Sequence, residues 1–293
     1  MFIVINTPNG NVGRVVADQL IRAGEYVALL TRHPKQVADF ARRGAAIYEG
    51  DLSDWNYVKE ATVGCQRLFW ATPQAYEHPD LVHFQVELGF NLARAVVENE
   101  IPYVVNVSSL GAQHETGTGA IQGLREVERQ LDDSPANVLH LRAGYFMENF
   151  LYSMRAIQEE NAINLPIHGA VKAPMVASHD IAVLATNLLC EPDWEGHEVR
   201  EYVGPKFRSF DDAARVFSEV LGREIRHVHV SAEHSRNGMM RRGWSENSAN
   251  LIIEMYQALA EGMLMPEGTP LVAPTTLRWF ARTRIRQEKA AQG

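Results

Sequence analysis

The residues with the most direct chemical meaning lie between the first expected strand and the first expected helix, in residues 5–14, INTPNGNVGR. Gly10 would let the backbone approach a pyrophosphate, and Gly13 would let the helix pack closely on the strand. The free amides at the start of the helix would then face the anion. The spacing predicts a phosphate-binding loop, and a glycine-containing turn without a ligand is the competing interpretation.

A basic side chain, Arg32, directly follows the second expected strand. Proteins that bind NAD commonly carry an acidic residue at this position, whereas an arginine suits the additional phosphate of NADP. A guanidinium can pair with phosphate in bidentate geometry, and Arg14 or Lys35 would be its helpers. Arg32 therefore favours NADP(H), and a solvated arginine in a surface loop is the alternative.

The next two strand ends also carry residues suited to a nucleotide. Asp51 and Leu52 follow the third expected strand, where an acid and its neighbouring backbone can contact the adenine edge. Asp51, like Ser53, is also suited to cap the following helix, and the two interpretations are compatible. Ala71 and Thr72 follow the fourth strand, where their small side chains would let a cofactor pass close to the backbone.

The histidines and cysteines form no recognisable set of metal ligands in the sequence. His227 and His229 alternate along an expected strand and could both face outward, with His234 nearby. No carboxylate at a convincing spacing completes a site, and Cys65 and Cys190 have no local partner. We expect no metal site and no disulfide framework.

The elements that would position these residues alternate between strands and helices over the first 150 residues. Helices of this length between strands imply right-handed crossovers and a parallel sheet. The pattern predicts an α/β fold with a doubly wound parallel sheet of the Rossmann type. The expected strands are 2–5, 26–30, 46–49, 67–70, 103–107 and 138–141.

The pattern loosens in the second half. We expect residues 1–150 to form an NADP(H)-binding core and residues 151–293 mainly a smaller α/β substrate or effector lobe, with some strands returning to the core. Residues 262–274 are rich in Gly, Pro and Met and predict a mobile loop, and residues 282–293 are predicted to fray. Strands and helices are expected at 198–203, 210–221, 225–229 and 247–261.

Composition excludes several classes of protein. The 293 residues are 46% hydrophobic with a net charge of -8, so we expect no disordered chain and no direct nucleic-acid partner. No apolar run reaches the roughly 18 residues of a membrane-spanning helix. We expect a cytoplasmic protein with a small-molecule substrate and no membrane partner, and a homodimer is compatible with the sequence.

Several segments together resemble the NmrA-like group of atypical short-chain dehydrogenase/reductase proteins. Besides the nucleotide loop, residues 107–112 (VSSLGA) look like the family's fifth-strand signature. Residues 141–150 (LRAGYFMENF) closely match its Arg-x-Gly-aromatic-Phe-x-Glu-Asn segment. Residues 179–182 (HDIA) and 221–223 (LGR) resemble its later motifs. The resemblance covers nearly the whole chain.

This resemblance implies NADP(H) preference, as in many members, and a substrate cleft under a variable C-terminal lobe. Tyr145 and Phe146 would flank the nicotinamide end of the site. Cofactor contacts carried over by position are Thr7, Asn9, Gly10, Asn11, Val12, Arg32, Asp51, Leu52, Ala71, Thr72 and Ser108.

The C-terminal lobe would supply the substrate pocket. Methionines and aromatic side chains accommodate varied planar ligands, although such residues serve equally well in a core. The expected walls are Met147, Phe150, Met154, Met175, Trp244, Met255 and Tyr256, with residues 263–265 in a lid.

Two residues of the phosphate loop depart from the family. Thr7 stands where members usually carry glycine, and its Cβ disfavours a positive φ. Pro8 removes one amide donor while stiffening the loop. These departures leave open a scaffold that has lost cofactor binding.

The usual proton donor is also missing. The tyrosine-lysine pair of classical members is absent between residues 108 and 134. Many NmrA-like enzymes carry Lys or His four residues before a helix Glu, and aligning that Glu with Glu128 places Leu124 there. His114 and Tyr145 remain as candidates, against an exposed loop histidine and a packing aromatic. His114→Ala is expected to lower any turnover at least about tenfold, and unchanged turnover would remove His114 from the mechanism.

Two functions therefore compete. The first is an NADPH-dependent reductase of a small conjugated, quinone-like acceptor that takes its proton from water. The second is a non-catalytic NADP(H)-binding redox sensor that acts through a protein partner. Turnover without an added partner separates them.

Overall fold

The computed structural model describes residues 1–285 and contains one large parallel sheet. Its strands lie in the order β14-β11-β6-β5-β4-β1-β2-β3. From β1 the chain first adds β2 and β3 on one side and then crosses to β4 on the other side, so the strand order reverses between β1 and β4. Open sheets bind ligands at the carboxyl ends of the strands at such a point. The strands are β1 (Phe2–Asn6), β2 (Tyr26–Thr31), β3 (Ala46–Glu49), β4 (Arg67–Ala71), β5 (Tyr103–Ser109), β6 (Asn137–Ala143), β11 (His197–Val203) and β14 (Leu271–Val272).

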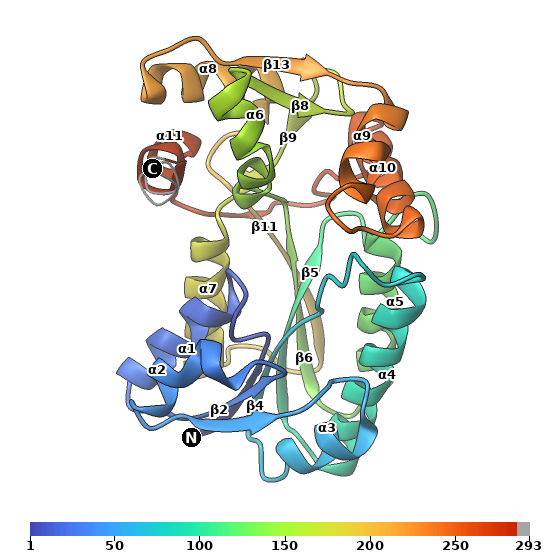
Figure 1. Ribbon diagram of the computed structural model, residues 1–293. Coiled ribbons are helices and arrows are strands. Elements are labelled where there is room, and N and C mark those ends of the chain that lie inside the picture. The colour runs from blue at the N-terminus through green and yellow to red at the C-terminus, as the bar shows by residue number, and fades with distance from the viewer. Residues whose placement is uncertain (286–293) are drawn as a thin grey trace.

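Helices cover both faces of this sheet, so its central strands bury side chains on both faces. α1, α2 and α7 lie on one face, and α3, α4 and α5 lie on the other (Figure 1). Val4, Leu29, Leu68 and Val105 are fully buried. The helices are α1 (Gly13–Arg22), α2 (Ala38–Ala41) after the 3-10 turn η1 (Pro34–Val37), α3 (Trp55–Ala61), α4 (Leu81–Glu98), α5 (Ile121–Asp132) and α7 (Ser178–Cys190).

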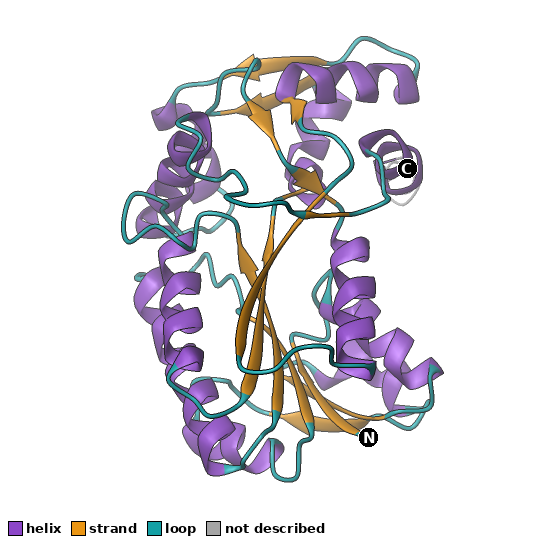
Figure 2. Ribbon diagram, turned by 180° about the vertical axis from the view of Figure 1, so that it is seen from behind, coloured by secondary structure: helices purple, strands orange, loops and turns teal. Residues whose placement is uncertain are grey.

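The remaining elements gather beyond the carboxyl ends of the strands, at the top of Figures 1 and 2. Short strand pairs join the helices there: β7 with β10, β9 with β12, and β8 with β13. These elements are β7 (Tyr145–Phe146), η2 (Met147–Ser153), α6 (Met154–Glu159), β8 (Ala162–Leu165), β9 (Lys172–Ala173), β10 (Met175–Val176), β12 (Arg208–Ser209), α8 (Phe210–Leu221), β13 (Arg226–His229), α9 (Ala232–Met240), α10 (Glu246–Ala260), α11 (Leu277–Phe280) and η3 (Ala281–Ile285).

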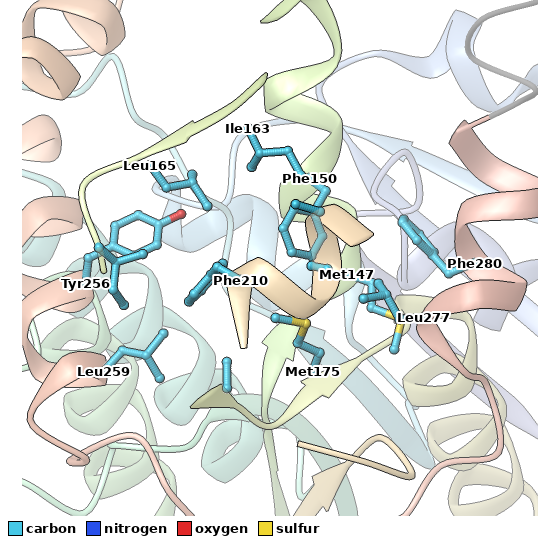
Figure 3. Packing of buried hydrophobic residues seen from close by; sticks show 14 of the residues in the cluster. Met147, Phe150, Ile163, Leu165, Met175, Phe210, Tyr256, Leu259, Leu277 and Phe280 are labelled. Carbon is cyan, nitrogen blue, oxygen red and sulfur yellow. The ribbon is translucent and has the colours of Figure 1, made fainter. Parts of the chain in front are cut away.

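A separate hydrophobic core holds this second group together (Figure 3). Phe150 is fully buried at its centre, with ring centroids 5.0 Å from Phe217 and 6.2 Å from Phe210. Met147 and Met175 belong to the same cluster. This core anchors the group to the end of the sheet.

The doubly wound parallel sheet predicted from the sequence is confirmed. The predicted helix 210–221 has the bounds of α8, because Ser209 and Asp212 form a capping box and Gly222 ends the helix at φ 66°. The predicted mobile loop is wrong in part, since β14 lies within it and pairs with β11. Most of the tail predicted to fray, residues 286–293, lies outside the described residues. No helix of the described chain is long and apolar enough to cross a membrane.

Candidate functional site

Three adjoining pockets follow the carboxyl edge of the sheet. The first, the loop pocket, lies where β1, β2 and β3 end and has a volume of about 340 Å³. It collects six of the predicted cofactor residues. Its walls are Thr7, Pro8, Asn9, Gly10, Leu30, Thr31, Arg32, His33, Gly50, Asp51, Leu52, Pro73, Gln74, Phe84 and Leu88.

At Thr7 the loop adopts a backbone conformation that normally favours glycine. Thr7 adopts φ 49°, in the left-handed region, and its carbonyl accepts a hydrogen bond from the Gly10 amide at 2.9 Å. A Cβ on Gly13 would lie 2.4 Å from the Thr7 carbonyl oxygen, so the predicted close packing at Gly13 is confirmed. The helix begins at Gly13, and its N-cap residue Val12 makes no side-chain capping hydrogen bond. The amides of Arg14 and Val15 donate to the carbonyls of Gly10 and Val12, which leaves the Gly13 amide to face an anion.

The basic residue of the loop pocket is Arg32. Its side chain is 54% exposed and lies 3.7 Å from the Asp51 carboxylate, a loose ion pair across the pocket. Arg14, the predicted helper, instead contacts the Asp39 carboxylate at 2.9 Å and lies over the Phe40 ring. The structure therefore engages Arg14 elsewhere and leaves Arg32 at the pocket.

The predicted capping role of Asp51 and Ser53 is wrong. Asp54 caps α3, because it directly precedes the helix in an extended conformation and accepts from the Asn56 amide at 2.9 Å. Asp51 accepts from the Ser53 amide at 3.0 Å and from its hydroxyl at 2.9 Å. This turn holds Asp51 at the loop pocket.

The second, the apolar pocket, joins the loop pocket at Gln74 and has a volume of about 240 Å³. Leu124, at the position for which the family resemblance predicts Lys or His, lines this pocket with an apolar side chain. Its walls are Val12, Ala71, Thr72, Gln74, Tyr76, Val107, Ser108, Ser109, Leu110, Ala120, Ile121, Leu124, Ala143, Gly144, Tyr145, Phe146, Asn149, Pro174, Ile252, Met255, Leu259 and Leu264.

One polar group in the apolar pocket lacks a partner. Ser108 is 3% exposed, and its hydroxyl oxygen forms no hydrogen bond with any described residue. Buried hydroxyls are normally hydrogen-bonded, so this one is available to a ligand. Of the predicted cofactor residues, Asn11 alone lines none of the three pockets.

The two candidate proton donors differ in position. Tyr145 lines the apolar pocket, and its hydroxyl lies 3.1 Å from that of Tyr256. Burial raises the pKa of Tyr145 well above its usual range, because the phenolate would lose its hydration. His114 lines none of the three pockets and directs Nε2 at the Met263 carbonyl, 3.0 Å away. The structure brings Tyr145 to the site and leaves His114 outside it.

The residues around Leu124 supply no other acid. Glu128 is 4% exposed and accepts two hydrogen bonds from the Arg142 guanidinium, at 3.0 and 2.6 Å. This bidentate pair engages both carboxylate oxygens of Glu128 within the fold. Arg125, adjacent to Leu124, contacts Glu126 at 2.9 Å.

The third, the arginine pocket, has a volume of about 610 Å³ and adjoins the apolar pocket through Tyr76, Asn149, Ile252 and Met255. Its walls are Tyr76, Asn149, Tyr152, Ser153, Arg155, Ala156, Glu159, Glu160, Asn164, Leu165, Pro166, Val230, His234, Ser235, Gly238, Met239, Arg241, Arg242, Trp244, Ile252, Met255 and Tyr256.

The expected substrate-pocket residues divide between pocket and core. Trp244 and Tyr256 line the arginine pocket. Met147, Phe150 and Met175 are at most 2% exposed in the core of Figure 3 and line none of the three pockets. Apolar side chains satisfy either environment, so their type alone did not decide between them.

Of the four joining residues, Met255 was expected as a pocket wall, whereas Tyr76, Asn149 and Ile252 were not predicted. Of these three, only Asn149 had a signal, as the last polar residue of the motif at 141–150. Tyr76 and Ile252 carry no local pattern, because the pockets meet only after α10 packs beside the loop that follows β4. Ser245 makes this contact, its amide donating to the Tyr76 carbonyl at 2.8 Å.

The expectation that His227 faces outward is wrong. Its side chain is 2% exposed, with Nδ1 3.9 Å from the Asp211 carboxylate. Burial lowers the pKa of His227. Within residues 1–285, no three His, Cys, Asp or Glu side chains lie together as a metal site would require.

Comparison with known proteins agrees with this architecture. An NAD(P)H azoreductase from Xenophilus azovorans is 27% identical over 256 residues, which cover 87% of this chain and 86% of that protein. A triphenylmethane reductase from Citrobacter sp., in complex with NADP(H), superimposes with a TM-score of 0.83 at 19% identity, covering 97% and 99% of the two chains. An NADPH-dependent quinone oxidoreductase from Escherichia coli, in complex with NADPH, gives 0.82 at 20% identity, covering 95% and 98%.

The sequence model of the NmrA-like family matches residues 2–272, which include the phosphate loop, the motif at 141–150 and the edge strand β14. The chain belongs to the NmrA-like family.

Proposed function

We propose that this chain is an NADPH-dependent reductase of a small conjugated, quinone-like acceptor. The observation that carries the proposal is the adjacency of two unlike pockets: an arginine-bearing loop pocket and an apolar pocket share the lining residue Gln74. The first suits a phosphorylated cofactor, and the second suits its nicotinamide together with a planar acceptor. The azoreductase and quinone oxidoreductase named above support this class of reaction.

Several features of the chain fit NADP(H). The uncapped start of α1 would offer the Gly13 amide to the pyrophosphate, and Gly10 has no side chain to obstruct it. Arg32 would hold the additional phosphate, with Asp51 beside it at the adenosine. Ser108 offers its unpaired hydroxyl inside the apolar pocket.

The bound cofactor would supply a hydride, and the chain would position the acceptor beside the cofactor and keep water from the space between them. The apolar walls exclude water from the space beside the cofactor and favour a flat, uncharged ring system. Tyr145 stays protonated at neutral pH, so its hydroxyl can donate a hydrogen bond to an acceptor oxygen. With Leu124 in place of a titratable side chain, solvent outside these walls would supply the proton that follows.

The first experiment is a parallel titration of the purified protein with NADPH, NADP+ and NADH, followed by turnover of a quinone without any protein partner. We expect NADPH to bind at least about tenfold more tightly than NADH, as a lost charge-assisted phosphate contact implies. Binding without turnover would reject the reductase in favour of a redox sensor. Binding of none of the three would reject both.

A further inference from the structure

The arginine pocket differs in charge from the apolar pocket it adjoins. Arg155 is paired with Glu159 at 2.9 Å, and Glu160 accepts from the Asn164 amide at 2.9 Å. The charged side chains Arg155, Glu159 and Glu160 therefore already have partners within the protein.

Two other cationic side chains that line the pocket have no anionic partner among the described residues. Arg241 and Arg242 follow the end of α9 and are exposed. Neither guanidinium forms an ion pair with any residue in the described part of the chain. In a protein with a net charge of -8, this local excess of positive charge at a pocket wall favours an anionic ligand group.

An aromatic surface lies in the same pocket. The rings of Tyr76 and Trp244 are stacked, with centroids 3.8 Å apart and planes inclined by 12°. Tyr152 meets Trp244 edge-on at 6.1 Å. Tyr76 also lines the apolar pocket, so this surface extends from one pocket towards the other.

We infer that the arginine pocket is a subsite for an acidic substituent of the acceptor. Arg241 and Arg242 bind the anionic group, a carboxylate or sulfonate, while the Tyr76–Trp244 pair packs against the aromatic frame that carries it. The preferred acceptors are then planar conjugated compounds with an acidic group at one end. The description as an acceptor subsite rests on the proposed reductase activity.

The test compares neutral and acidic forms of one acceptor in three proteins. NADPH-dependent reduction of 1,4-naphthoquinone and of 1,4-naphthoquinone-2-sulfonate is measured for the wild type, for R241Q/R242Q and for a control, R226Q/R236Q. The control removes the same charge from β13 and α9 at positions outside the pocket. We expect R241Q/R242Q to raise KM for the sulfonate about tenfold and to leave the neutral quinone within about twofold, because only the sulfonate loses charge-assisted hydrogen bonds.

A binding experiment without turnover separates the subsite from the reaction. Calorimetric titration with naphthalene-2-sulfonate should show Kd increasing about tenfold in R241Q/R242Q and remaining unchanged in the control. If this holds while no quinone is reduced, the reductase fails and the anion subsite stands. If both quinones are reduced but respond equally to R241Q/R242Q, or if the wild type does not bind the sulfonate, the subsite is rejected.

Discussion

The loop pocket and the apolar pocket adjoin at one residue, Gln74, yet they are built differently. The loop pocket comes from consecutive strand ends within the first 88 residues and carries an exposed arginine and a carboxylate. The apolar pocket draws on segments from Val12 to Leu264 and encloses a hydroxyl without a partner. Under the proposed function the difference separates two tasks: the loop pocket would hold the cofactor by backbone and charge, and the apolar pocket would surround the acceptor with apolar walls.

The largest effect should follow from disturbing the backbone of the loop pocket. Gly13→Ala places a Cβ 2.4 Å from the Thr7 carbonyl oxygen, so the loop must move. We expect Kd for NADPH to increase about 100-fold, equivalent to about 3 kcal/mol of overpacking, in a fluorescence titration. Gly238→Ala is the control, since its Cβ meets only the Arg241 guanidinium at 3.9 Å. A Kd within about threefold of wild type would show that the loop relaxes freely.

A smaller and more selective effect is expected at the charge of the loop pocket. Arg32→Gln removes the guanidinium that faces Asp51 and should weaken NADPH binding about tenfold while leaving NADH binding almost unchanged. Arg42→Gln removes the same charge from a nearby exposed position and serves as the control. Equal losses of affinity for NADPH and NADH would mean that Arg32 supports the fold of the pocket and does not bind the additional phosphate.

The positive φ of Thr7 should lower the free energy of unfolding of the protein, and this cost should be measurable. Thr7→Gly removes a Cβ at φ 49° and should increase the free energy of unfolding by about 0.5 to 1 kcal/mol in urea denaturation, after the entropy of glycine offsets part of the relief. Glu100→Gly, at φ 50° and away from the pockets, should give a similar gain without affecting NADPH binding. A loss of stability in Thr7→Gly alone would assign a stabilising contact to the Thr7 side chain.

The smallest effect is expected in the apolar pocket. Tyr145→Phe should change turnover by less than about threefold, since loss of a true proton donor costs about 100-fold or more. Turnover should stay level between pH 6 and 9 in both proteins, because the pKa of Tyr145 lies well above this range. His114→Ala, outside the pocket, is the matched variant. A tenfold fall in Tyr145→Phe alone would identify Tyr145 as the donor.

Much of the fold and of the loop pocket could be predicted from local pattern. Apolar runs separated by amphipathic helices fix a parallel sheet, and the spacing of Gly10 and Gly13 marks the turn where α1 approaches β1. Arg32 and Asp51 could be identified because each follows a strand end, and the ends of parallel strands meet at one edge.

The C-terminal walls could not be predicted in the same way. Phe150 and Trp244 are both large and apolar, yet one fills the core of Figure 3 and the other lines the arginine pocket. Because hydrophobic burial is non-directional, the sequence indicates that such residues are buried but not which residues they pack against. His114 failed as a candidate for a related reason, since only the packed loop shows that it turns to Met263.

The sequence by itself determined the sheet, the phosphate loop and the absence of a titratable side chain at position 124, because these depend on periodicity, spacing and residue type along one stretch of chain. The tertiary structure decided that Thr7 takes the left-handed conformation, that Ser108 is left unpaired, and that Arg241 and Arg242 meet an aromatic surface beside the apolar pocket. Those outcomes arise from contacts between segments far apart in the chain, and only the folded packing sets their distances.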